Sequence, residues 1–224
     1  MPSLGRLHLI TDTRPGCDPL GVLRAALAAA RAADATADLV VQVRVEDDMS
    51  DRDAYELTGR AVAECVAYQV TCLVNDRLHV ALATGAAGAH VGALDLPVDA
   101  ARRVLGPAAI LGATARDPAT GRAAVAAGAT YLGVGPCYAT GTKSGLPDPI
   151  GLAGLAAVAA AVDVPVVAIA GVTVDRVPEL LAAGAHGVAV VGAIAAAADP
   201  GRATADLLTA VRQRPTGTDN GAPA

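Results

Sequence analysis

Two aspartates in this sequence could bind a divalent cation together. Asp76 follows the apolar run 70–75, and Asp95 follows the apolar run 88–92. Mg²⁺ is commonly held by one or two carboxylates together with phosphate oxygens of a substrate. The pair therefore predicts a magnesium site. The alternative is that each aspartate caps the helix that follows it.

A second group of residues could bind phosphate. The stretch TGTK brings the hydroxyl groups of Thr140 and Thr142 close to the ammonium group of Lys143, with Gly141 between the two threonines. Such a glycine-containing loop can present several hydrogen-bond donors to an anion. A solvated surface loop with no ligand would have the same composition, so this alternative stays open.

Small residues follow three further apolar runs. Thr114 ends the run 109–114, Gly171 follows the run 164–170, and Val191-Gly192 closes the run 187–192. Glycine leaves the backbone N–H groups accessible to a phosphate, although it could equally serve only a tight turn.

Polar residues alternate at the end of another apolar run, in the stretch VQVRVED. There Gln42, Arg44 and Glu46 occupy every second position. This alternation indicates either a solvated edge or the rim of a site.

The elements that must position these groups are eight short apolar runs separated by Ala- and Leu-rich helical patterns. The runs are 7–11, 38–44, 70–75, 88–92, 109–114, 129–135, 164–170 and 187–192. Strands that are apolar throughout, rather than alternating, are typical of a parallel sheet buried on both faces. The sequence predicts an α/β protein with a single (β/α)8 TIM barrel of parallel strands. A doubly wound open sheet is the lesser alternative.

The chain shows no internal domain boundary. We expect one barrel domain over residues 1–213 and a disordered tail over 214–224, where Pro, Gly and Thr are frequent. The repeated stretch AAGA places Gly88, Gly128 and Gly184 before apolar runs, and we expect each to end a helix in a left-handed conformation.

Composition narrows the class of protein. The net charge is −5 and aromatic residues make up 2%, so nucleic acid is not an expected partner. No apolar run reaches the roughly 18 residues of a membrane span, and the start of the chain is a poor signal peptide. We therefore expect a cytoplasmic protein. His8 and His90 fall within apolar runs and are expected to be hydrogen-bonded structural residues.

In a barrel, the carboxyl ends of the strands gather at one rim. The groups above would then form two anion pockets beside a divalent cation. The sequence shows no Ser/His/Asp arrangement, so the site suits loss of a phosphate-type leaving group with little need for a protein nucleophile.

These residues, in this order, resemble the thiamine-phosphate synthase family over roughly residues 5–210. The motifs that carry the resemblance are LITD (9–12), Q-x-R (42–44), the pair Asn75-Asp76, H-x-G-x-x-D (90–95), G-x-T (112–114) and GP-x-x-x-T-x-TK (135–143).

The resemblance implies an Mg-dependent barrel transferase. It would join a hydroxymethylpyrimidine diphosphate to a hydroxyethylthiazole phosphate, or its carboxylated form, with loss of pyrophosphate. Asp76 and Asp95 would hold Mg²⁺. Residues implied to bind the pyrimidine diphosphate are Gln42, Arg44, Asn75, Thr114 and Lys143. Residues implied to bind the thiazole phosphate are Thr140, Gly141, Thr142, Gly171, Val191 and Gly192.

Several positions depart from the family pattern. Gly192 stands where Ser is usual, Ala170 where Gly is usual, and Ala93 where Gln is frequent. Glu46 is the most consequential, because the family has Lys there. Losing a charge-assisted hydrogen bond costs about 1.5–3 kcal/mol. Glu46 could point into solvent, join the metal shell, or mark a changed substrate.

The departures leave two rival interpretations. One is a divergent paralogue, such as a thiazole tautomerase-like enzyme, for which the stretch after residue 114 offers Arg116 but no histidine. The other is a non-catalytic barrel that binds a pyrimidine or thiazole phosphate without turning it over.

Overall fold

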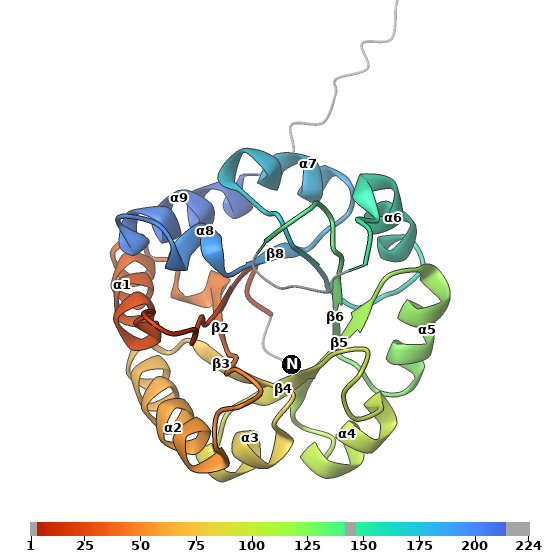
Figure 1. The fold of residues 1–224 in the computed structure, drawn as a ribbon. Helices are drawn as coiled ribbons and strands as arrows, with labels where there is room; N and C mark the ends of the chain where they lie inside the picture. Colours follow the sequence, from red (N-terminus) through yellow and green to blue (C-terminus); the bar gives the residue numbers. More distant parts are fainter. Residues whose placement is uncertain (1–3, 142–146, 214–224) are drawn as a thin grey trace, which may run out of the picture.

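The protein forms a closed barrel of eight parallel strands surrounded by helices (Figure 1). This computed structural model describes residues 4–141 and 147–213. The strands are β1 (Leu7–Ile10), β2 (Leu39–Val43), β3 (Thr71–Asn75), β4 (Gly88–Val91), β5 (Ile110–Ala115), β6 (Tyr131–Val134), β7 (Val166–Ile169) and β8 (Gly187–Val190). Each pairs with the next, and β8 closes on β1. The predicted barrel is confirmed, and each strand lies within one of the eight apolar runs, β5 extending one residue beyond.

The helices follow the strands in alternation. They are α1 (Pro19–Ala32), α2 (Asp51–Tyr68), α3 (Leu78–Thr84), α4 (Val98–Leu105), α5 (Pro118–Ala126), α6 (Gly151–Ala159), α7 (Val177–Ala182), α8 (Gly192–Ala195) and α9 (Pro200–Arg212), with short 3₁₀ turns at Thr36–Asp38 (η1) and Val174–Arg176 (η2). Within the described residues, none of these helices has the length and hydropathy to cross a membrane. The predicted tail, 214–224, lies outside those residues.

Local sequence signals fix where several helices begin. Asp18, Ser50 and Asp199 each accept a backbone N–H bond at the first turn of α1, α2 and α9. Asp117 and Thr120 form a reciprocal capping box at the start of α5. These side chains satisfy N–H groups that have no partner inside the helix.

Strand residues alternate between two apolar layers. Leu7 and Leu9 of β1 face the helices, whereas Ile10 joins a small cluster inside the barrel. That inner cluster also contains Val40, Leu73, Tyr131, Val167 and Ala189. The period-two alternation of a strand then directs the next inward residues, those at the carboxyl ends, into the barrel mouth.

Two of the three expected helix-ending glycines are confirmed. Gly128 (φ 106°) and Gly184 (φ 96°) follow Ala127 and Ala183, the C-cap residues of α5 and α7, in a left-handed conformation. The prediction for Gly88 is wrong, because Gly85 (φ 69°) ends α3 instead. Gly88 begins β4, where an added Cβ would lie 1.8 Å from the Ile110 carbonyl oxygen. Close strand approach, rather than helix termination, requires glycine there.

Candidate functional site

A row of hydrogen-bonded side chains connects the ends of β2 and β3. The Gln42 amide donates to Asn75 Oδ1 over 2.9 Å, and Asn75 Nδ2 donates to Asp76 Oδ2 over 2.8 Å. Gln42 is buried at the inner face of β2. The two amides therefore leave few alternative positions for the Asp76 carboxylate.

Asp76 and Asp95 are electrostatically coupled. Burial and the negative charge of Asp95 together raise the pKa of Asp76, against the lowering effect of the Asn75 hydrogen bond. Asp76 also adopts a left-handed backbone with φ 53°, a conformation that costs energy and often occurs at functional sites.

Neither aspartate acts as the helix cap considered above. Helix α3 begins after Arg77 and helix α4 after Pro97, and neither has a side-chain cap. Asp95 instead accepts a hydrogen bond from the Gly92 backbone N–H over 2.6 Å. The negative charges of these two carboxylates repel each other, and their oxygen atoms are the ligands that a divalent cation such as Mg²⁺ prefers. The residues present fit Mg²⁺.

Arg44 is hydrogen-bonded to Thr11, which directly follows β1, and forms an ion pair with Glu46. Its backbone N–H donates to the Thr11 hydroxyl over 2.8 Å, and that hydroxyl donates back to the Arg44 carbonyl over 2.7 Å. Arg44 Nη1 lies 2.8 Å from Glu46 Oε1. Glu46 is therefore paired with Arg44 and does not extend alone into solvent. Within residues 4–141 and 147–213, it forms no hydrogen bond or ion pair with Asp76 or Asp95.

Thr114 reaches the mouth at the end of β5, where it contacts a buried histidine. His90 Nε2 lies 3.0 Å from Thr114 Oγ1, and His90 Nδ1 lies 3.1 Å from the Tyr131 hydroxyl. Gly112 makes room for the two rings, because a Cβ there would lie 2.1 Å from Tyr131 Cζ. The prediction that His8 and His90 are hydrogen-bonded inside strands is confirmed.

The segment after β6 is attached to the end of β7. Cys137 and Tyr138 donate backbone N–H bonds to the Ile169 and Ala170 carbonyls over 2.9 and 3.2 Å. The Arg176 guanidinium lies 4.2 Å from the centre of the Tyr138 ring, whose hydroxyl donates to Glu179.

Gly171 lies directly under this segment. Its φ is 66°, and an added Cβ would lie 2.6 Å from Tyr138 Cβ. Thr140 and Gly141 continue the segment toward solvent. Thr142 and Lys143, which were expected to bind phosphate, lie outside the described residues.

Val191 and Gly192 lie where β8 passes into α8. Val191 precedes the helix and Gly192 is its first residue. The first backbone N–H groups of any helix have no intrahelical acceptor. The backbone N–H groups of Val191 and Gly192 therefore lie at the carboxyl end of β8, as the sequence predicts. Among the described residues, they form no hydrogen bond with Gln42, Asn75 or Asp76.

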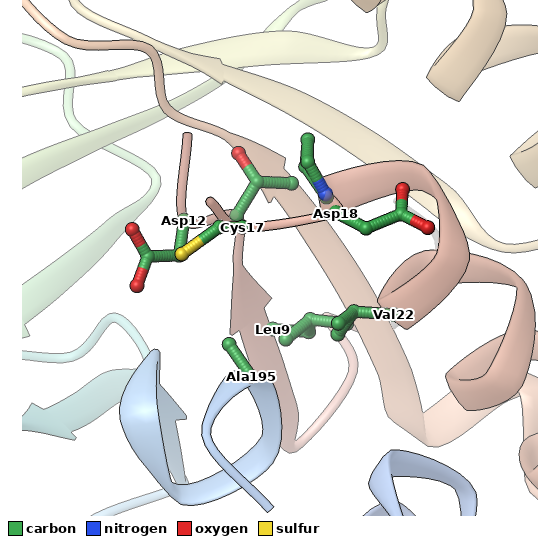
Figure 2. Close-up of a pocket in the computed structure, with 8 residues that line it drawn as sticks. Leu9, Asp12, Cys17, Asp18, Val22 and Ala195 are labelled. Carbon is green, nitrogen blue, oxygen red and sulfur yellow. The ribbon is translucent and has the colours of Figure 1, made fainter. Parts of the chain in front are cut away.

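The sequence interpretation assigned no role to the polar residues after β1. Asp12 is buried and accepts hydrogen bonds from Arg14, and Figure 2 shows the Cys17 side chain beside its carboxylate. The signal was available, because Asp12 directly follows the apolar run 7–11, as Asp76 follows the run 70–75. The cavity drawn there has a volume of only about 20 Å³, which is room for one water and not for a substrate.

A closed parallel barrel with carboxylate, guanidinium and amide groups at its mouth defines the class as a TIM-barrel protein. Within that class, residues 7–194 match the family model described as thiamine monophosphate synthase. The chain belongs to this family, and the resemblance found in the sequence is confirmed.

Individual relatives agree with the family model. The chain is 65% identical over 211 residues to a thiamine-phosphate synthase from Salinispora arenicola, covering 94% of this chain and 99% of that protein. A Salinispora tropica protein of the same name is 64% identical over 211 residues, with the same coverage.

Solved structures show the same backbone arrangement. The thiamine phosphate pyrophosphorylase from Pyrococcus furiosus superposes with a TM-score of 0.81 at 32% identity, covering 92% of this chain and 95% of that one. A 3-hexulose-6-phosphate synthase superposes with a TM-score of 0.65 at 21% identity and shares the fold alone.

Proposed function

We propose that this chain is a thiamine-phosphate synthase. It would join 4-amino-2-methyl-5-hydroxymethylpyrimidine diphosphate to 4-methyl-5-(2-hydroxyethyl)thiazole phosphate, or its carboxylated form, and release pyrophosphate, together with carbon dioxide when the thiazole is carboxylated. The observation that carries the proposal is the hydrogen-bonded row of Gln42, Asn75 and Asp76, with Arg44 two residues after Gln42 in the chain. Family membership supports the same assignment.

The pyrimidine diphosphate would bind over the ends of β2 to β5. Gln42 and Asn75 offer amide groups of fixed orientation for the ring, and Arg44 offers a guanidinium for phosphate oxygens. Thr114 adds a hydroxyl group. Lys143 would add a second cation from outside the described residues.

The thiazole phosphate would bind over β6 to β8. Thr140, Gly141 and Thr142 come from the segment after β6, and Gly171 holds that segment close to β7. Backbone N–H groups at Val191 and Gly192 would complete the phosphate pocket.

Asp76 and Asp95 would hold Mg²⁺, which supplies charge neutralisation for the departing pyrophosphate. The raised pKa of Asp76 supports this role, because a bound cation offsets the repulsion from Asp95 and the cost of burial.

The proposed reaction is dissociative. The bond between the pyrimidine methylene carbon and the diphosphate oxygen breaks first, and the thiazole nitrogen donates its electron pair to the methylene cation. The residues of this chain would bind, orient and stabilise charge, and none would act as a nucleophile. Both substrates are phosphorylated and do not cross membranes unaided, so we place the reaction in the cytoplasm.

One assay tests the proposal. The purified protein is incubated with both substrates and Mg²⁺, and thiamine phosphate and pyrophosphate are measured together, with EDTA as the control. Equimolar formation of both products is expected only with the metal. Binding of either substrate without any product, over a full range of Mg²⁺ concentrations, would instead support the non-catalytic barrel.

A further inference from the structure

Three buried or half-buried side chains form a continuous hydrogen-bonded chain across β4, β5 and β6. Tyr131 is 1% exposed and His90 is 9% exposed. The Tyr131 hydroxyl contacts His90 Nδ1 over 3.1 Å, and His90 Nε2 contacts Thr114 Oγ1 over 3.0 Å. Only Thr114, at the end of the chain of contacts, is partly exposed to the barrel mouth.

The direction of the first hydrogen bond follows from the phenol. Burial raises the pKa of Tyr131, so its hydroxyl keeps its hydrogen. Within residues 4–141 and 147–213, His90 Nδ1 is the one hydrogen-bond partner of that hydroxyl. A buried O–H group requires an acceptor, so Nδ1 accepts and carries no hydrogen.

The direction of the second hydrogen bond follows from the imidazole. An imidazolium has a hydrogen on both nitrogens and could not accept from Tyr131, so the ring is neutral and has one N–H group. With Nδ1 acting as an acceptor, that hydrogen is on Nε2 and is donated to Thr114 Oγ1. The opposite tautomer would leave the Tyr131 hydrogen without an acceptor in the described part of the chain.

The Thr114 hydroxyl thus accepts from His90, and its own hydrogen must be directed elsewhere. His90 is the only hydrogen-bond partner that the described residues provide for this hydroxyl. The Thr114 oxygen also lies near Gly92, next to Asp95, because a Cβ added at Gly92 would be 4.0 Å from Thr114 Oγ1 and 3.0 Å from Asp95 Oδ2.

We propose that Tyr131 and His90 are positioning residues that hold the Thr114 hydroxyl as a hydrogen-bond donor to an acceptor atom of the pyrimidine diphosphate. This inference rests on the proposed function for the identity of the ligand. The hydrogen of the Thr114 hydroxyl then has a fixed position. A ligand with a lone pair at that point is preferred over a ligand with an N–H or O–H group there.

Steady-state kinetics of four proteins test the coupling: wild type, Thr114→Val, Tyr131→Phe and the double variant. Thr114→Val should lower kcat/KM for the pyrimidine substrate about tenfold, and Tyr131→Phe about threefold, because one hydrogen bond is lost or loses its fixed direction. The double variant should match Thr114→Val within about twofold, because Tyr131 acts only through the hydroxyl that is already absent.

The matched controls separate positioning from general structural damage. Thr114→Ser keeps the hydroxyl and should remain within about threefold of wild type. The KM for the thiazole phosphate should stay unchanged in Tyr131→Phe. Independent effects that multiply in the double variant, or an equal rise in both KM values, would overturn the proposal.

A measurement without substrate decides the tautomer. In protein labelled with ¹⁵N at histidine, the ring nitrogens of His90 should show the Nε2–H form in wild type and a mixture of forms in Tyr131→Phe. An Nδ1–H form in wild type would overturn the positioning role. Because the free protein is used, this result stands even if the wild type makes no thiamine phosphate and the proposed function fails.

Discussion

The Glu46 carboxylate lies against the Arg44 guanidinium, with Nη1 and Oε1 2.8 Å apart and Nη2 and Oε2 3.5 Å apart. Both side chains are partly exposed, at 23% and 30%. Arg44 is the cation that the diphosphate is proposed to use. Glu46 would therefore compete with the substrate for the same guanidinium nitrogens.

Replacing Glu46 should strengthen substrate binding. In Glu46→Gln the competing charge is removed, and in Glu46→Lys it is reversed, so the KM for the pyrimidine diphosphate should fall in that order. A pair of this exposure is worth roughly 0.2–1 kcal/mol, which limits the gain from Glu46→Gln to about fivefold. Steady-state kinetics with the thiazole phosphate held saturating measure the change.

Asp38→Asn is the matched control for this experiment. Asp38 pairs with Arg212 over 2.6 Å at comparable exposure, but it precedes β2 at the end of the barrel opposite the mouth. Its removal should leave both KM values unchanged. If Glu46→Lys also leaves the KM for the pyrimidine substrate unchanged, Arg44 does not bind the diphosphate.

Asp76→Asn should stabilise the fold while abolishing its response to Mg²⁺. The pKa of Asp76 is raised in the folded state, so ionisation of its carboxyl group opposes folding. This penalty is absent below the unfolded pKa near 3.8 and is complete above the raised folded pKa. The Tm of the variant should therefore exceed that of wild type at pH 7, and the difference should vanish as the pH falls below about 4.

Thermal unfolding with and without Mg²⁺ tests the metal site separately from catalysis. At a concentration ten times Kd, the metal should stabilise wild type by about 1.4 kcal/mol, or roughly 3–6 °C. Asp76→Asn should show no such shift. Asp163→Asn, an exposed aspartate ahead of β7, should behave as wild type. An equal shift in all three proteins would place the metal elsewhere.

The architecture could be predicted from the sequence because eight apolar runs have one simple solution, a parallel sheet covered on both faces. The placement of polar groups at strand ends followed from the same rule. Asn75 and Asp76 were therefore predicted to lie at the rim, whereas for Gln42 the pattern left open a solvated edge or the rim. The hydrogen bonds of the structure bring the three side chains together.

Other features were beyond the reach of sequence patterns. The pairing of Glu46 with Arg44 depends on side-chain rotamers, which an alternating pattern does not specify. Gly88 was expected to end a helix, but it lies at the start of β4 and Gly85 ends α3. The need for glycine at position 88 comes from the close approach of β4 to β5. The Tyr131–His90–Thr114 chain depends on strand register, since His90 pairs with Gly112 and Gly112 with Tyr131.

Gly171→Ala should weaken binding of the thiazole phosphate. The new methyl group would lie 2.6 Å from Tyr138 Cβ and 2.8 Å from the Ala139 carbonyl oxygen, so the segment that leads to Thr140 must move. We expect the KM for the thiazole phosphate to rise at least about fivefold, the cost of roughly one hydrogen bond, while the KM for the pyrimidine substrate changes little.

Gly85→Ala separates crowding from backbone strain. Gly85 has nearly the same φ, 69°, but an added Cβ there has no neighbour within 4 Å. Both variants should lose about 1–2 kcal/mol of stability from the left-handed backbone. Only Gly171→Ala should change the kinetics, and equal kinetic effects in the two variants would show that the loss is unspecific.

Ala170→Gly should stabilise the protein. Ala170 has a φ of 75°, a region that costs a residue with a Cβ about 1–2 kcal/mol. Glycine removes this cost but loses about 0.4–1 kcal/mol through the greater freedom of the unfolded chain. The net gain is about 0.5–1 kcal/mol, measurable by urea unfolding. Ala123→Gly, at an exposed position inside α5 with ordinary helical backbone, should instead lose about 1 kcal/mol. A loss at both positions would mean that Ala170 is not strained, and that the glycine usual in the family serves close approach of a ligand rather than the backbone.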